Sequence, residues 1–290
     1  MRSSLITLAL VLAAGCNGSS KPRPPAPPAP PQGSGFSVTL RRNTVDVKHL
    51  VRDPERRYPS GAGILCSWNR DRFLHFFSSG SEEICDVVFL DSAGRVIELE
   101  QLAASNEVGI TSKTEARHAL FLGAGAIRKD GLQVGDPVAF SPAVAEAKPA
   151  PMPVIKVGGH DVHVETSHTL VQRQRGLMHR PRLSKDDGML FLYPAEDERG
   201  FWMKNTLIAL DIAYFADDGR LINVARMKPA ANPAEGGVLK APSAAPARFV
   251  LEVNYGWFDA RQLIDADGKP TQPVRLELPD SLRKLADMAE

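Results

Sequence analysis

The sharpest group of polar residues in the chain is Lys204-Asn205-Thr206, which lies in a stretch that is otherwise apolar and rich in β-formers. An amine, an amide and a hydroxyl so close together can bind a small polar or anionic group, with Trp202 and Met203 beside them and Arg175 as a further cation. The same side chains can instead form a polar clamp that fixes a helix against a hairpin. For Lys204 and Asn205 the sequence leaves both roles open.

Asp211 follows in the same stretch and interrupts a strand that we predict over residues 207–215. A buried carboxylate without a partner costs several kcal/mol, so we expect Lys204 or Arg175 to supply the opposite charge. The first half of the chain has Asp86 at the matching place, but there the Lys-Asn-Thr block is lost. This difference favours a structural role for Asp211 and Asp86.

The competing function is an enzyme acting on cell-envelope carbohydrate or peptide, with Asp211 and either Lys204 or Glu165 as acid and base. The chain has no Gly-x-Ser-x-Gly elbow, phosphate loop or dinucleotide fingerprint. We therefore favour a non-catalytic binding or envelope-structural module and assign no catalytic residue.

Cys66 and Cys85 align with Phe191 and Leu210, which are apolar positions, so we predict two buried small hydrophobes. A disulfide between neighbouring strands is the alternative. His160 and His163 point to opposite faces of a strand and cannot chelate from there. We predict no metal site and no cofactor.

The N-terminus has the order of a bacterial lipoprotein signal: Arg2, ten hydrophobic or small residues over 5–14, and then Cys16 as the lipidation site. We predict a signal peptide over 1–15 and a Pro-rich tether over 16–35. The expected partner is a membrane, reached through the lipid anchor. Asn17 favours the outer membrane, facing the periplasm, over the inner membrane.

After the tether, one linker and an internal repeat organise the rest of the chain. A Pro/Ala linker over 141–153 separates a degenerate copy of a β domain (36–140) from a second copy (154–279), and 280–290 is a short helix or tail. The copies align without a gap at an offset of 125 from Thr44 against Thr169, and at an offset of 131 after an insertion in the second copy.

Short strands dominate both copies. In the second we predict strands at 162–165, 189–193, 201–203, 207–215, 221–224 and 248–253, with a helix over 169–178 that Ser167 caps. The fold class is mainly β with a minor helical part: two tandem antiparallel sandwiches or partly open barrels, each with a short helix. Lys and Arg (35) balance Asp and Glu (34), which argues against nucleic-acid binding.

The second copy resembles a known family. Its blocks "RQRGLMHRPRL", "DGMLFLYP", "FWMKNTLIALDIAYFADDGRL" and "ARFVLEVNYGW" are similar to those of the bacterial and archaeal family called domain of unknown function 192, over about residues 160–265. The resemblance implies a compact, mainly β, often exported domain without a settled activity. The first copy resembles the family faintly, and Ala209 stands where the family often has proline.

Overall fold

The computed structural model describes residues 36–50, 63–78, 82–149, 151–232 and 241–290. The predicted signal peptide, Cys16 and the Pro-rich tether lie outside these residues. The chain divides into two compact units, Met1–Ala150 and Pro151–Glu290. Within the described residues, no helix has the length and apolar character needed to cross a membrane.

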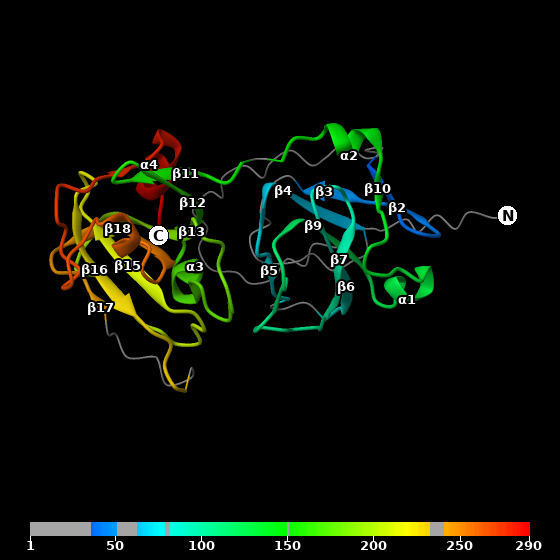
Figure 1. Cartoon of the computed structure of the whole chain (residues 1–290), viewed down its shortest axis with the longest axis horizontal. Helices are drawn as coiled ribbons and strands as arrows, with labels where there is room; N and C mark the ends of the chain where they lie inside the picture. Colours follow the sequence, from blue (N-terminus) through cyan, green and yellow to red (C-terminus); the bar gives the residue numbers. More distant parts are fainter. Residues whose placement is uncertain (1–35, 51–62, 79–81, 150, 233–240) are drawn as a thin grey trace, which may run out of the picture. The chain divides into compact units, whose positions relative to one another are not determined.

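The second unit is built on one large sheet, in which seven strands have the order β16-β15-β18-β13-β12-β11-β19 (Figure 1). Neighbours are antiparallel except β12 and β13, which are parallel. The strands are β11 (Val154–Val157), β12 (His160–Ser167), β13 (Asp187–Asp197), β15 (Leu210–Phe215), β16 (Leu221–Met227), β18 (Ala247–Asn254) and β19 (Leu276–Glu277). A small second sheet pairs β14 (Gly200–Phe201) with β17 (Ala241–Pro242).

Both faces of this sheet are buried, because the central strands carry apolar residues in both directions. One face packs Val164, Leu251 and Val253 against helix α4 (Asp280–Asp287), which contributes Leu282 and Ala286. The other face packs a second apolar cluster that includes Met189, Phe191, Ile212 and Val250, and the segment after helix α3 (Leu170–Arg175) contributes Leu177 and Leu183 to it. Buried apolar area on both faces is the main stabilising term of such a layered domain.

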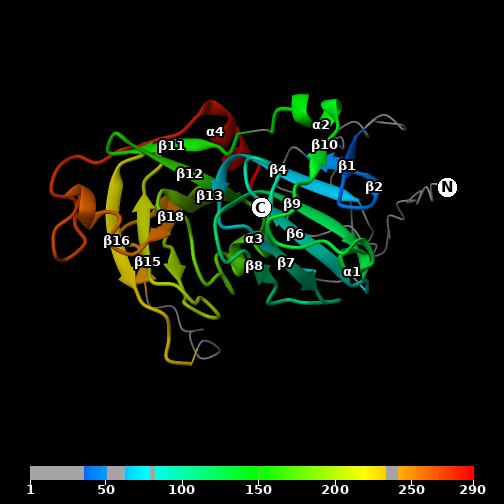
Figure 2. The same cartoon turned by 45° about the vertical axis from the view of Figure 1, so that its right-hand side comes forward.

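The first unit contains a five-stranded sheet of order β3-β4-β9-β6-β7, with β4, β9, β6 and β7 side by side in Figures 1 and 2. A three-stranded sheet has the order β10-β1-β2, and β5 pairs with β8. The strands are β1 (Ser37–Thr39), β2 (Thr44–Asp46), β3 (Lys48–Leu50), β4 (Ile64–Arg72), β5 (His75–Phe76), β6 (Cys85–Leu90), β7 (Val96–Leu102), β8 (Ile110–Thr111), β9 (Ala116–Gly123) and β10 (Ala139–Phe140), with helices α1 (Ala126–Asp130) and α2 (Pro142–Glu146).

The two units are copies of one fold. The order β3-β4-β9-β6-β7 repeats as β12-β13-β18-β15-β16, and in both sheets only the first of these pairs is parallel. The pairing register also repeats: Val88 faces Leu120 as Ala213 faces Leu251, at the predicted offsets of 125 and 131. The mainly β fold class is confirmed, and the curled half-barrel sheet agrees with a partly open barrel.

The predicted alignment is wrong before Gly63. The pair Val38–Val45 corresponds to Ile155–Val162, which gives an offset of 117 rather than 125. The second copy therefore has eight more residues in this segment: 20 lie between Ser167 and Gly188, whereas 12 lie between the corresponding Leu50 and Gly63. The sequence alignment did not reveal this gap, because the matching glycines, Gly63 and Gly188, lie after it in the chain.

The second copy also differs from the predictions near its helix. The helix ends at Arg175, and its N-cap is Thr169, in a reciprocal capping box with Gln172, rather than Ser167. The N-cap thus lies two residues later than expected, and the helix begins at Leu170. Leu170 and Val171, in its first turn, are 55% and 67% exposed.

The predicted linker and tail are more ordered than their composition indicates. Helix α2 lies inside the linker and buries Val144 in the core of the first copy. Helix α4 belongs to the core of the second copy through Leu282 and Ala286. A few apolar side chains at helical spacing were enough to attach both segments.

The Asp218-Gly219 turn of the second copy and the Ala93-Gly94 turn of the first have a strict requirement for glycine. Gly219 has φ 82° and Gly94 has φ 76°, a region that L side chains rarely adopt. A Cβ would also lie 2.5 Å from the carbonyl oxygen of Leu276 at the first, and 2.8 Å from that of Val138 at the second. Together, the positive φ and the nearby carbonyl oxygen explain why both copies have glycine at this position.

Candidate functional site

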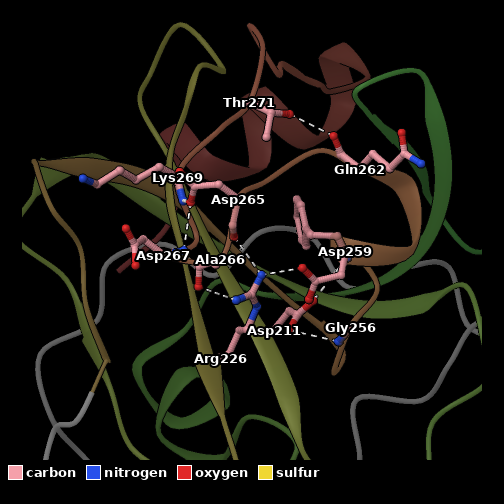
Figure 3. Close-up of polar contacts among 11 residues, drawn as sticks. Asp211, Arg226, Gly256, Asp259, Gln262, Asp265, Ala266, Asp267, Lys269 and Thr271 are labelled. Carbon is pink, nitrogen blue, oxygen red and sulfur yellow. Dashed lines mark hydrogen bonds and ion pairs between the residues drawn. The ribbon is translucent and has the colours of Figure 1, made fainter.

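Asp211 is fully buried on β15, and its carboxylate holds the turn that follows β18 (Figure 3). Oδ1 accepts a hydrogen bond from the backbone N–H of Gly256 (3.1 Å), and Oδ2 accepts one from Phe258 (3.2 Å). Burial raises the pKa of the Asp211 carboxyl, while the two backbone donors act in the opposite direction. Two backbone N–H groups that would otherwise be buried without acceptors are satisfied in this way.

Asp86 does the same in the first copy. Its Oδ2 accepts from the backbone N–H of Ile127 (2.9 Å), which corresponds to Phe258, and its Oδ1 accepts from Nε2 of Gln101 (3.1 Å). In both copies the carboxylate therefore ties its own strand, β15 or β6, to the segment that follows β18 or β9.

The expected cationic partner of Asp211 is wrong, because neither Lys204 nor Arg175 binds it. The cation beside Asp211 is Arg226, its cross-strand neighbour on β16. Arg226 donates to the carbonyl oxygens of Ala266 (2.7 Å) and Asp265 (2.9 Å) and pairs with Asp259, as Figure 3 shows. Sequence analysis did not identify Arg226 as the cation beside Asp211. Its position opposite Asp211 across the Asp218-Gly219 hairpin was the signal that indicated it.

The Asp265–Gly268 segment is a turn. Oδ1 of Asp265 accepts from the backbone N–H groups of Asp267 and Lys269, both at 2.9 Å, and Gly268 has φ 76° (Figure 3). This carboxylate serves the turn itself. No group of three or more His, Cys, Asp or Glu side chains suited to a metal ion occurs in the described part of the chain.

The Lys-Asn-Thr block is a tight turn rather than part of a strand. The backbone N–H of Thr206 donates to the carbonyl of Met203 (3.1 Å), and Asn205 has φ 53°, which asparagine tolerates better than most residues. The Asn205 carbonyl accepts from the N–H of His179 (2.7 Å), which attaches the turn to the segment after α3. Lys204 is exposed, whereas Met203 and Thr206 are buried.

Glu165 and Asp211 do not converge. Glu165 lies in register with Met189 and Ile212 on one face of the sheet, and Asp211 lies with Val253 on the other. Strands β13 and β18 separate them, a distance of about 14 Å at the usual strand spacing. The pairing of Asp211 with Glu165 as acid and base, one of the two forms of the competing enzyme hypothesis, is therefore wrong.

Glu165 is held instead by Arg180, through two hydrogen bonds of 2.7 and 2.6 Å. Both side chains are almost completely buried, at 9% and 5% exposed. A buried and bidentate ion pair of this kind fixes the segment after α3 on the sheet.

Cys66 and Cys85 do not form a disulfide, so that alternative is wrong. Strand β9 lies between their strands, and their partners on β9, Ala119 and Gly123, are four residues apart. The Cα atoms are thus roughly 16 Å apart, whereas a disulfide needs less than about 7 Å. Burial raises the pKa of the Cys85 thiol to about 11, with Asp86 and Glu83 adding to the shift.

A pocket of about 550 Å³ opens beside Trp202 in the second copy. Its central feature is Tyr193, whose ring is contacted by two guanidinium groups: that of Arg173 lies 4.7 Å and that of Arg199 lies 3.9 Å from the ring centroid. Leu170 and the half-buried Trp202 provide apolar walls. The pocket is lined by Leu170, Arg173, Gln174, Tyr193, Pro194, Ala195, Glu196, Asp197, Arg199, Gly200, Phe201, Trp202 and Glu290.

Backbone carbonyls hold both arginines in place. Arg173 Nη1 donates to the carbonyl oxygens of His168 (2.8 Å) and Leu192 (3.2 Å). Arg199 donates through Nε to Ala247 (3.2 Å) and through Nη2 to Ala195 (2.8 Å). Desolvation lowers the pKa of the Arg199 guanidinium, which is nevertheless charged at any physiological pH.

Three acidic residues also line the pocket: Glu196, Asp197 and Glu290. The Glu196 carboxylate accepts from the backbone N–H of Asp217 (2.6 Å), and the Asp197 carboxylate accepts from that of Glu198 (2.8 Å). Asp197 lies 3.8 Å from Arg199 and is 71% exposed, which makes it a weak, screened partner. Arg173 and Arg199 are the two cations that contact the Tyr193 ring.

The first copy has the same backbone here without the charge. Arg199 corresponds to Leu74: the N–H of Arg199 donates to Ser243 Oγ, and the N–H of Leu74 donates to Ser112 Oγ, both at 3.0 Å. Leu74 is buried at 2% exposed. The two copies therefore differ in the chemistry at this position.

The predicted binding residues are only partly brought together. Trp202 lines the pocket, whereas Lys204, Asn205 and Thr206 form the separate turn, and Arg175 ends α3 without lining the pocket. Sequence analysis missed Arg173, Tyr193 and Arg199, because no spacing rule links residues that meet only through the packing of α3 on β13.

The chain matches the sequence model of the DUF192 family, described as "Uncharacterized ACR", over residues 54–140 and again over 153–268. No curated protein matches it.

Among solved structures, the chain is similar to a protein of unknown function from Novosphingobium aromaticivorans DSM 12444, with 31% identity over 43% of this chain and 83% of that one, and a TM-score of 0.35. It is also similar to a protein from Sinorhizobium meliloti 1021 described as a "putative transcription regulator", with 20% identity over 69% of this chain and 98% of that one, and a TM-score of 0.34. Both TM-scores are low, so neither structure supports an inference about this chain.

Proposed function

The chain belongs to the DUF192 family, with one match on each copy, and from this premise we propose that it is a non-catalytic binding lipoprotein whose second copy binds a small anionic ligand. The ligand site is the pocket beside Trp202. The first copy serves as a structural module and the second performs the recognition.

The observation that carries this proposal is the position of the Arg173 and Arg199 guanidinium groups over the ring of Tyr193, within a pocket of about 550 Å³. That volume is in the range of small-molecule sites. Guanidinium groups recognise carboxylate and phosphate through paired N–H donors, and stacking on an aromatic ring holds their planes for such a contact. The apolar walls of Leu170 and Trp202 suit a ligand that also has a flat or apolar part.

The proposed address rests on the N-terminal sequence. A positive residue, a short hydrophobic run and small residues before Cys16 are the order of a lipidation signal, and the Pro-rich residues 16–35 suit a spacer between a membrane and the folded copies. The protein would thus be exported and anchored in the cell envelope, at the outer membrane and facing the periplasm. Replacing Cys16 by Ser should move it from the membrane fraction to the soluble fraction, and unchanged fractionation would contradict the anchor.

Ligand binding is tested by the thermal unfolding of the purified full-length chain with benzoate, phenyl phosphate or the neutral benzamide. Binding of an anion at 100 times its dissociation constant stabilises the folded state by about 2.7 kcal/mol. We expect at least one of the two anions to raise the unfolding temperature, and benzamide to leave it unchanged.

The variant that removes the effect is Arg199→Leu, because the first copy has leucine on the same backbone. Lys204→Ala is the matched control: it removes one positive charge from the same copy, outside the pocket. Loss of the anion response in Arg199→Leu but not in Lys204→Ala is the expected result. No anion response in the wild type, or an equal response in Arg199→Leu, would overturn the proposal.

A further inference from the structure

The pocket contains a segment of its own chain. Glu290, beyond the end of α4, lies among the lining residues. Its backbone N–H donates to the carbonyl oxygen of His168 (3.2 Å), and its own carbonyl oxygen accepts from Nη2 of Arg173. Both main-chain groups of Glu290, its N–H donor and its oxygen acceptor, are thus bound. A groove that holds an extended peptide binds main-chain groups in the same way.

The fold delivers this segment to the pocket. Leu282 and Ala286 fix α4 in the core, and the last residue of the helix, Asp287, pairs with Arg248. Arg248 also donates through Nε to the carbonyl oxygen of Tyr193 (3.2 Å), so the end of the helix is connected to the central residue of the pocket. Residues 288–290 therefore begin beside the pocket and need little further ordering to enter it.

The contacts also indicate what kind of ligand fits. His168 and Arg173 bind the main chain of Glu290, a recognition that any peptide segment can satisfy. Arg173 and Arg199 add two positive charges, which favour acidic side chains near that main chain. The exposed Leu170 offers apolar contact to a neighbouring residue of the segment.

We propose that the pocket binds an acidic peptide segment in an extended conformation, and that Ala289–Glu290 is an internal ligand that occupies it until a partner's segment displaces it. This inference rests on the proposed function and specifies the ligand class of the same site. Displacement is feasible because Glu290 is itself exposed and is held by two main-chain contacts. A tethered competitor acts at a high effective concentration, so it weakens the binding of a free peptide without any change of the site itself.

The test uses a fluorescent peptide with blocked ends, acetyl-Ala-Asp-Met-Ala-Glu-amide, which reproduces residues 286–290. Fluorescence anisotropy measures its binding to the full-length chain and to two variants. One variant ends after Met288. The other, Glu290→Pro, keeps the length but lacks the N–H that donates to the carbonyl oxygen of His168. We expect both variants to bind the peptide at least about tenfold more tightly than the wild type, in line with the removal of a tethered competitor.

Two controls decide the chemistry. The peptide with Asn and Gln in place of its acidic residues should bind at least about tenfold more weakly, and Arg199→Leu in the shortened chain should lose binding. Equal binding of the neutral peptide, or no gain on shortening the chain, would overturn the inference. If phenyl phosphate binds but no peptide does, the inference fails while the proposed function stands, and if neither binds, both fail.

Discussion

Replacement of Asp211 tests whether the buried carboxylate is a structural element. In Asp211→Ala the backbone N–H groups of Gly256 and Phe258 lose their acceptors in a site that is fully buried. Each unsatisfied buried donor costs about 1–3 kcal/mol, and the relief of carboxylate burial offsets part of the sum. We expect a loss of about 3 kcal/mol in the free energy of unfolding of the second copy.

Asp211→Asn separates hydrogen bonding from size. The amide has one oxygen, so it can accept from only one of the two backbone donors, and its NH₂ group faces the other; the expected loss is about 1–3 kcal/mol. Asp86→Asn is the matched variant in the first copy. Its loss should be smaller, because Gln101 can rotate its amide and accept from the new side chain.

The assay is urea denaturation of the full-length chain followed by tryptophan fluorescence, since Trp257 in the second copy is buried at 3% exposed. The pH dependence provides a further check. Burial raises the pKa of Asp211 in the folded state above its ordinary 3.8, so the folded state binds more protons than the unfolded state in the window above that value. Stability of the wild type relative to Asp211→Asn should therefore fall as the pH rises through this window. A loss below about 0.5 kcal/mol for Asp211→Ala, a value typical of surface substitutions, would refute the structural role.

Three further predictions concern other parts of the scaffold. Arg180→Met should destabilise the second copy by about 3–5 kcal/mol in the same assay, because Glu165 is left as a buried charge, and a change typical of an exposed ion pair would contradict that burial. Mass spectrometry of the unreduced chain should find Cys66 and Cys85 unbridged, and iodoacetamide at pH 8 should modify folded Cys85 far more slowly than the unfolded chain, because of its raised pKa; fast modification would argue against that pKa. Gly219→Ala should lower the unfolding temperature, because of its positive φ and of a clash with a main-chain carbonyl, whereas full stability would show that the turn can rearrange.

Much of the fold follows from local patterns in the sequence. Short runs rich in apolar and β-forming residues predict the long strands β13, β15 and β18, and the Asp-Gly pair predicts the hairpin at Gly219. The repeat was visible because glycine and core positions tolerate few substitutions. It was misaligned before Gly63, because strands that pair in parallel carry no local signal that fixes the length of the segment between them.

The candidate site depended far more on tertiary structure. The Lys-Asn-Thr block was noticed for its polarity, yet its backbone closes into a turn because Asn205 takes a positive φ and Thr206 bonds back to Met203. Only Trp202, beside the block, also lines the pocket.

The sequence by itself determined the family, the mainly β class, the duplication and the structural role of Asp211. Each depends on local patterns or on residues that a particular backbone conformation requires. Only the tertiary structure decided which charges meet. Arg173 on α3 and Arg199 after β13 both reach the ring of Tyr193, and Glu290 reaches Arg173 from the far end of the chain. Such contacts arise from long-range packing of helix on sheet, and no sequence spacing encodes them.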